Sequence, residues 1–167
     1  MDGKTWVPSK VLAKAGGAPY GATKYSDDPT PAPIFLTTVL VRAGMQKARI
    51  YASARGLYEL YVDGKKVSGD IFRPGWTDYR KRVQYQVYDL TAMLKPGIHD
   101  VSMVVGDGWY CGNVAWTGRQ NYGPRPMALA QIELDYPKGI KDVIATGNEW
   151  KGRYGPIDSD DLLMGES

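Results

Sequence analysis

Cysteine and histidine are almost absent from this sequence. It has one of each, Cys111 and His99. This excludes an internal disulfide, a zinc site built from several cysteines and histidines, and any multi-histidine metal centre. A Ser-His-Asp triad could only use His99, which follows Pro96 and Gly97 at a predicted strand start, where we expect a structural role. Cys111 has no thiolate-stabilising pattern beside it and is expected to be inert.

Long apolar runs and strong charge are also missing. There is no run of about 18 apolar residues and no charged-then-apolar leader, so the sequence shows neither a membrane span nor an export signal. The net charge is +3, and its densest basic cluster is residues 80–82. That is too little to indicate nucleic-acid binding. We therefore expect neither a membrane nor a nucleic acid as partner.

Glycine, proline and polar aromatic residues are abundant. The 167 residues include 20 glycines and 11 prolines, with 12 tyrosines and 5 tryptophans against 2 phenylalanines. The glycines and prolines divide the chain into short pieces joined by turns. Rings that carry a polar atom suit surfaces and grooves better than dry cores. With 43% hydrophobic residues the chain can still bury a core.

Short β-rich runs follow an irregular start. Residues 1–33 predict an irregular N-terminal arm, and residues 34–167 predict one module. Asp63 and Gly64 are a strong hairpin signal, and the most apolar run, 101–105, is expected at the centre of a sheet. No convincing amphipathic helix is found, so the pattern predicts an all-β, jelly-roll-like antiparallel β-sandwich. The expected strands are 34–41, 47–54, 57–62, 65–67, 83–88, 101–105, 127–136, 142–145 and 150–153.

Two aromatic loops, 72–79 and 106–125, are the main functional candidates. Flat rings beside Asp and Asn are typical of sugar sites, because C–H faces pack on rings while hydroxyls bond to carboxylates and amides. The alternative is that the rings close the ends of the sandwich, with Trp76 and Trp109 as buried plugs. The candidate sugar-binding residues are Trp76, Asp78, Tyr79, Asp107, Trp109, Tyr110, Asn113, Asn121 and Tyr122.

Two other patterns favour structural interpretations. The glycines at 106, 108 and 112 differ from a dinucleotide fingerprint, because the third glycine is one position late and no helix pattern follows. Asp158, Asp160 and Asp161 have no separated carboxylate partner of the kind a glycosidase needs, and we expect them to form a solvated turn. No catalytic residue is predicted.

Several ordered blocks carry a family resemblance over roughly residues 33–166. The blocks are GLYELYVDG at 56–64, RPGWTDYRKRVQYQ at 73–86, VYDLT at 87–91, GDGWY at 106–110, NYG at 121–123 and IAT at 144–146. Together they resemble the N-terminal β-sandwich module of bacterial α-L-rhamnosidases. The resemblance implies a piece of a multidomain glycoside hydrolase that removes terminal α-L-rhamnose by inversion. Its acid and base carboxylates would lie on a separate (α/α)6 barrel C-terminal to the module.

The same resemblance implies a ligand and a metal. Some modules of this type bind L-rhamnose through a calcium ion that also contacts sugar hydroxyls, which suits a hard cation with open positions. Asp78 and Asn121 are the candidate calcium ligands here, with carbonyls from residues 124–126.

Three hypotheses follow. In the first, the module is non-catalytic and recognises L-rhamnose or rhamnosylated glycans through the two loops. In the second, it only braces the remaining domains of the parent enzyme, and Trp76 and Trp109 are buried. The third, a self-contained hydrolase, needs two facing carboxylates within about 10 Å.

Overall fold

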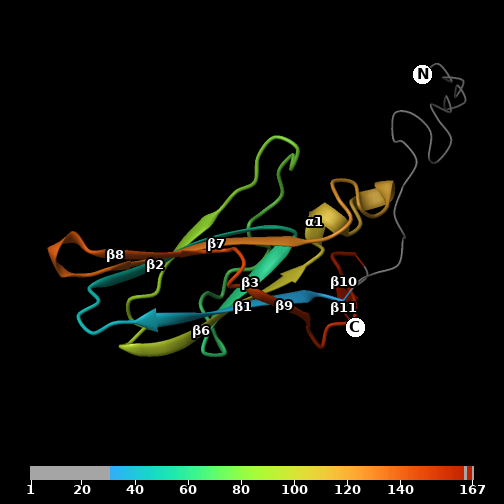
Figure 1. Cartoon of the computed structure of the whole chain (residues 1–167). Helices are drawn as coiled ribbons and strands as arrows, with labels where there is room; N and C mark the ends of the chain where they lie inside the picture. Colours follow the sequence, from blue (N-terminus) through green and yellow to red (C-terminus); the bar gives the residue numbers. More distant parts are fainter. Residues whose placement is uncertain (1–30, 164, 167) are drawn as a thin grey trace, which may run out of the picture.

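The chain folds into a sandwich of two antiparallel sheets. The computed structural model describes residues 31–163 and 165–166; the expected N-terminal arm lies outside this range except for its last three residues. Figure 1 shows the sheets as two layers, with α1, β10, β11 and the C-terminus together at one end of the sandwich. We call this end the loop end.

The strands divide unequally between the layers. The larger sheet has the spatial order β4 (Lys65–Lys66), β3 (Leu57–Val62), β6 (Gly97–Gly106), β1 (Pro33–Val41) and β9 (Lys151–Tyr154). The smaller sheet has the order β5 (Gln86–Asp89), β2 (Lys47–Arg55), β7 (Met127–Asp135) and β8 (Lys141–Ala145). A separate two-stranded ladder joins β10 (Asp160–Asp161) to β11 (Gly165–Glu166).

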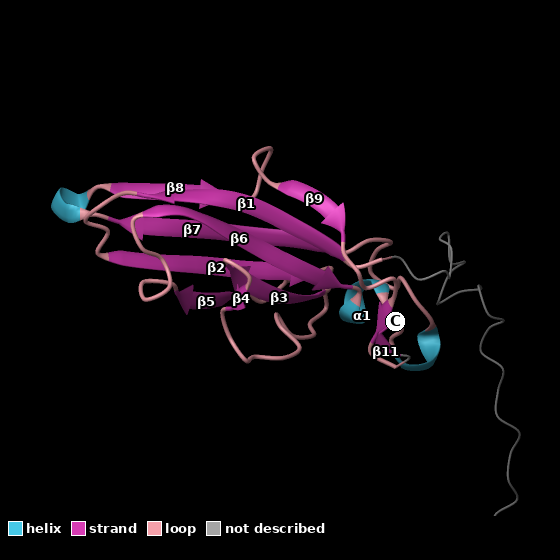
Figure 2. Ribbon diagram, turned by 90° about the horizontal axis from the view of Figure 1, so that it is seen from below, coloured by secondary structure: helices cyan, strands magenta, loops and turns pink. Residues whose placement is uncertain are grey.

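Successive strands mostly alternate between the sheets, and their pairings are antiparallel. From β1 to β7 the chain crosses between layers at nearly every step, leaving β8 beside β7 and returning with β9 to the edge of β1. Figure 2 shows the same arrangement from below. The predicted jelly-roll-like antiparallel sandwich is confirmed.

The core follows from side-chain alternation along these strands. In β2, Ala48, Ile50 and Ala52 point inward and are buried, while the residues between them face outward. The long β6 lies between β3 and β1, so the apolar run 101–105 is central, as predicted. The fully buried side chains between the sheets include Val39, Val41, Val62, Leu90, Leu94, Val101, Met103, Val105, Ile132 and Leu134.

The β3–β4 hairpin forms at the predicted turn. Asp63 and Gly64 have φ values of 48° and 73°. Positive φ at both central residues is the geometry that the Asp-Gly pair favours, because it matches the twist of the flanking strands. The Asp63-Gly64 pair alone is therefore enough to predict this turn.

The prediction for residues 83–88 is partly wrong. Only Gln86–Asp89 form a strand, β5, in which Gln86 and Tyr88 are partly buried while Val87 and Asp89 are exposed. The hydroxyl of Tyr58 donates to Gln86 Oε1 at 2.8 Å, and it lies 3.2 Å from the Tyr88 hydroxyl. Because these polar groups form hydrogen bonds inside the sandwich, the side of β5 that faces the core is not its apolar side.

Among the residues that the structure describes, helical structure is limited to three short pieces. They are α1 (Gly108–Cys111), η1 (Ala115–Thr117) and η2 (Pro137–Gly139). The helix α1 does follow Gly106, which the sequence did not indicate, but it is a single turn of four residues. Within residues 31–163 and 165–166, no helix combines the length and apolar character needed to cross a membrane.

Candidate functional site

The two aromatic loops meet at the loop end, although about 30 residues separate them in sequence. The rings of Trp76 and Trp109 stack with centroids 6.0 Å apart and planes 10° apart. Tyr79 packs edge-on against Tyr110 and Tyr122, at centroid distances of 5.4 and 5.1 Å. The structure therefore brings together five of the nine predicted residues, in two groups with different surroundings.

The inner group, Tyr79, Tyr110 and Tyr122, is part of a small core. Tyr79 and Tyr110 are 4% and 5% exposed. Their edge-to-face contacts are of the kind that stabilise packed rings. Burial raises the pKa of the Tyr79 phenol to about 12, and its hydroxyl donates to the Gly75 carbonyl at 3.3 Å. These rings hold the loops together and offer little surface to a ligand.

The outer group, Phe72, Trp76 and Trp109, faces solvent. Trp76 is 53% exposed, and Phe72 lies 6.1 Å from Trp109, ring centroid to ring centroid. Trp109 is half-buried and packs its other side against the inner group. Trp76 is therefore no buried plug, and the structure disagrees with that part of the bracing hypothesis.

Asp107, two residues before Trp109, is engaged within the protein. Its carboxylate is 1% exposed and accepts a hydrogen bond from the Arg119 guanidinium. The same guanidinium donates to Asp161 at 3.0 Å. Asn113 also binds Asp161, through its backbone N–H at 2.8 Å and its side-chain amide at 3.0 Å. Asp107 and Asn113 thus fix the 106–125 loop to the C-terminal segment.

The expectation of a solvated turn at residues 158–161 is wrong for two of the three aspartates. Asp158 is exposed, but Asp160 accepts from the Asp107 backbone N–H at 2.8 Å, and the Asp161 side chain is 4% exposed. For Asp161 the physical reason is Arg119, which comes from another loop and supplies the countercharge that a buried carboxylate needs. We call Asp107, Arg119, Asp160 and Asp161 the carboxylate network.

Burial in this network shifts two pKa values. Desolvation raises the pKa of the Asp107 carboxyl, although Arg119 opposes this. Desolvation and the nearby charge of Asp107 raise the pKa of Asp160 to about 6. Sequence reasoning missed Arg119; the signal was a cation within a loop otherwise rich in rings and amides.

The proposed calcium ligands, Asp78 and Asn121, lie in the two loops with Arg80 close to both. Asp78 Oδ1 accepts from the Arg80 backbone N–H at 3.2 Å, and the Arg80 guanidinium donates to the Asn121 carbonyl at 3.2 Å. The Asn121 amide nitrogen donates to Gly118. Calcium takes about six to eight oxygen ligands, usually with several carboxylates. One carboxylate, which lies 3.7 Å from the Lys81 ammonium, does not fit that requirement.

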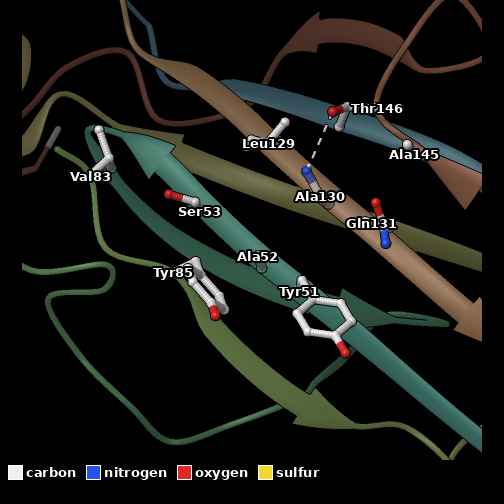
Figure 3. A pocket seen from close by; sticks show the side chains of 10 residues that line it. All are labelled: Tyr51, Ala52, Ser53, Val83, Tyr85, Leu129, Ala130, Gln131, Ala145 and Thr146. Carbon is white, nitrogen blue, oxygen red and sulfur yellow. Dashed lines mark hydrogen bonds between the residues drawn. The ribbon is translucent and has the colours of Figure 1, made fainter.

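Sequence reasoning also missed a shallow trough on the outer face of the smaller sheet (Figure 3). Its volume is about 420 Å³, and no charged side chain lines it. Tyr51 and Tyr85 project from neighbouring segments with ring centroids 6.3 Å apart, and Leu129 on β7 is 63% exposed. Apolar residues at outward positions of β2 and β7 were the available signal.

The single histidine and cysteine have structural surroundings. His99 Nδ1 lies 2.7 Å from the Asp63 carboxylate, and its Nε2 lies 2.7 Å from the Lys95 carbonyl. The hydrogen bond to Asp63 raises the pKa of His99. Cys111 is buried, which raises the pKa of its thiol. Both side chains are engaged within the fold, and their structural and inert roles stay predictions.

Known proteins resemble this chain along its whole length. The α-L-rhamnosidase of Streptomyces avermitilis is 41% identical over the full chain, which covers 16% of that enzyme. Its crystal structure, solved as a complex with L-rhamnose, superposes with a TM-score of 0.80 over 99% of this chain and 16% of that one. The α-L-rhamnosidase structure from Aspergillus terreus is 32% identical with a TM-score of 0.80, covering 84% of this chain and 17% of that one.

A family model described as the α-L-rhamnosidase N-terminal domain matches residues 43–167. This match covers the sandwich from the β1–β2 turn onward, including both aromatic loops. The chain spans about a sixth of the curated S. avermitilis relative. We conclude that the chain belongs to the α-L-rhamnosidase N-terminal domain family.

Proposed function

We propose that this chain is a non-catalytic, L-rhamnose-recognising module of an α-L-rhamnosidase. The observation that carries the proposal is the stack of Trp76 on Trp109, which leaves about half of the Trp76 side chain open to solvent at the loop end. The S. avermitilis relative was crystallised with L-rhamnose, which supports the choice of sugar.

The geometry divides the nine candidate residues by role. The open face of Trp76 would pack on the C–H face of the sugar. Asp78 in the same loop and Asn121 in the 106–125 loop would form hydrogen bonds with the sugar hydroxyls. Trp109 would form the base of the stack. The remaining candidates would hold the two loops in position: Tyr79, Tyr110, Tyr122, Asp107 and Asn113.

Catalysis is assigned to other parts of the parent enzyme. Glycoside hydrolysis uses two carboxyl groups flanking one bond, about 5 to 10 Å apart. Asp107 and Asp161 are committed to Arg119, which leaves Asp78 as the carboxylate nearest to Trp76 in the sequence. We expect no turnover of an aryl α-L-rhamnoside by this chain, and turnover above the rate of a buffer blank would contradict the assignment.

Calorimetric titration with L-rhamnose tests the binding proposal. We expect saturable binding in the millimolar range, lost in Trp76→Ala. The matched control is Trp116→Ala, because Trp116 is fully exposed on the same 106–125 loop and should not affect affinity. A titration that shows no saturable heat of binding at millimolar sugar would contradict the proposal.

The same titration in calcium and in EDTA separates the metal from the sugar. Because Arg80 bonds to the Asn121 carbonyl, we expect equal affinities in both. Binding only in calcium would show that Asp78 and Asn121 rearrange to hold the ion.

A second candidate function, bracing of the remaining enzyme, is favoured by the trough in Figure 3. Its uncharged lining and the exposed Leu129 suit a protein surface. The occupant we propose is the remainder of the longer chain, because the relatives extend far beyond this module. Leu129→Asp should weaken association with the separately expressed remainder while leaving rhamnose binding unchanged.

A further inference from the structure

A second cavity lies at the edge where β9 pairs with β1, apart from the nine candidate residues of the loop end. Its volume is about 370 Å³, in the range of small-molecule sites. Its walls include Phe35 from β1, Gly152, Arg153 and Tyr154 from β9, and Arg125 and Pro126 at the entry to β7.

Two arginines give this cavity a positive charge that nothing in its lining neutralises. Arg125 and Arg153 are exposed, and no acidic residue lines the cavity. Within the part of the chain that the structure describes, neither arginine forms an ion pair, whereas Arg49, Arg73 and Arg119 each do. A guanidinium is suited to bind a carboxylate through two parallel hydrogen bonds.

The cavity also offers aromatic surface to a flat apolar face. Gly152 pairs with Phe35 across the β1–β9 ladder. A Cβ at Gly152 would lie 3.6 Å from two carbons of the Phe35 ring, so the glycine leaves that part of the ring uncovered. Tyr154, two residues on, is 61% exposed. Rings of this kind pack against the C–H face of a sugar.

These two features together select one ligand class. A simple anion would not use the rings, and a neutral sugar would leave both arginines without a partner. We propose that this cavity binds a uronic acid, a sugar ring that carries a carboxylate. The proposal does not require the loop end to bind L-rhamnose.

The test is an NMR titration of the full chain, following backbone amides, with D-galacturonate and D-glucuronate as probes. D-galactose, sodium acetate and sodium sulfate are the matched comparisons. We expect saturable shifts at residues 125 and 152–154 with millimolar uronate and much weaker ones with the other compounds. Equal affinity for acetate or sulfate would show a general anion site and overturn the proposal, as would equal affinity for galactose or no saturable shift.

Variants separate the charge from the ring surface. Arg125→Gln and Arg153→Gln should each weaken uronate binding about tenfold, the effect of losing one charge-assisted contact. Gly152→Ala should cover the Phe35 ring and abolish the preference for uronate over acetate; its added methyl makes only ordinary contacts. If that variant is misfolded by its amide spectrum, the arginine variants carry the test.

Two controls complete the design. Lys138→Gln removes a positive charge in η2, at the opposite end of the sandwich (Figure 1), and should change nothing. Trp76→Ala should keep uronate binding, so failure of the rhamnose proposal and failure of this one can be distinguished. Loss of uronate binding in Lys138→Gln to the same extent as in Arg153→Gln would indicate non-specific attraction and overturn the proposal.

Discussion

The inner and outer ring groups at the loop end each consist of three aromatic residues, but their surroundings differ. Tyr79 and Tyr110 are almost fully buried, whereas Trp76, three residues before Tyr79, is half exposed. Both groups draw rings from the same two loops, and both form close ring contacts. An aromatic loop residue is therefore not evidence of a ligand site until its exposure is known.

The difference has a physical cause in what lies beneath each group. The inner rings pack on Cys111, the last residue of the single-turn helix α1. The carboxylate network fixes the residues around this helix to the C-terminal segment. Of the outer rings, Trp109 packs on the inner group, whereas Trp76 stacks on Trp109 and stays half exposed. We therefore expect changes to the inner group and its network to act mainly on stability, and changes to the outer group to act mainly on binding.

The largest effect is expected from Arg119→Met. It leaves the buried Asp107 and Asp161 carboxylates without their countercharge, and breaking a buried pair in this way costs about 3 to 5 kcal/mol. Urea unfolding followed by tryptophan fluorescence measures the loss.

Arg42→Met is the control for Arg119→Met. Arg42 pairs with Asp142 on the surface, where solvent screens the interaction. Arg42→Met should therefore lower the free energy of unfolding much less than Arg119→Met does. If the two variants unfold at the same urea concentration, the carboxylate network does not hold the loop end together.

Next comes Tyr79→Ala, which empties the centre of the inner group. Truncating a buried aromatic side chain costs about 3 kcal/mol or somewhat more, and the thermal midpoint should fall accordingly. Tyr79→Phe loses only the 3.3 Å hydrogen bond to Gly75 and should retain most of the stability. A Phe variant as unstable as the Ala variant would contradict packing as the main contribution.

The fold was largely readable from the sequence because its signals are local. The Asp63-Gly64 turn and the alternation in β2 and β7 are set by neighbouring residues. The inward side of β5 was not readable, because the inward position of Gln86 and Tyr88 depends on Tyr58, which lies about 30 residues away.

The site was readable in composition but not in arrangement. The sequence indicated that the 72–79 and 106–125 loops matter, yet exposure of Trp76 and burial of Tyr79 arise only when the loops meet. The Asp161 carboxylate pairs with Arg119, about 40 residues earlier. No local pattern reports a countercharge that arrives from another loop.

A smaller effect is expected from pH acting on Asp160. Its pKa is raised from 3.8 to about 6, so the folded chain holds this proton more tightly than the unfolded chain does. The resulting stability is fully present below pH 3.8 and is lost as the pH rises through about 6. Asp160→Asn keeps an oxygen for the Asp107 N–H and removes the titration.

The measurement for Asp160 is the difference in unfolding free energy between the variant and the parent chain at several pH values. As the pH rises from acid to neutral, the unfolding free energy of Asp160→Asn should increase by about 1 to 2 kcal/mol relative to that of the parent chain. This value is reduced to allow for partial solvent screening. A difference that does not change with pH would show that Asp160 does not titrate in this range. Asp158→Asn, at an exposed position, is the matched control.

The smallest effect on stability is expected from Trp76→Ala. About half of the Trp76 surface is already in solvent. Truncating this side chain should therefore lower the free energy of unfolding by no more than about 1 kcal/mol, well below the value for a fully buried ring. Trp109→Ala should cost more, because Trp109 also packs on the inner group. Both variants would lose rhamnose binding, but only Trp76→Ala would do so with an almost unchanged urea midpoint. Equal destabilisation by the two would place Trp76 in the core with the tyrosines, and the division between an inner, stabilising group and an outer, binding group would no longer hold.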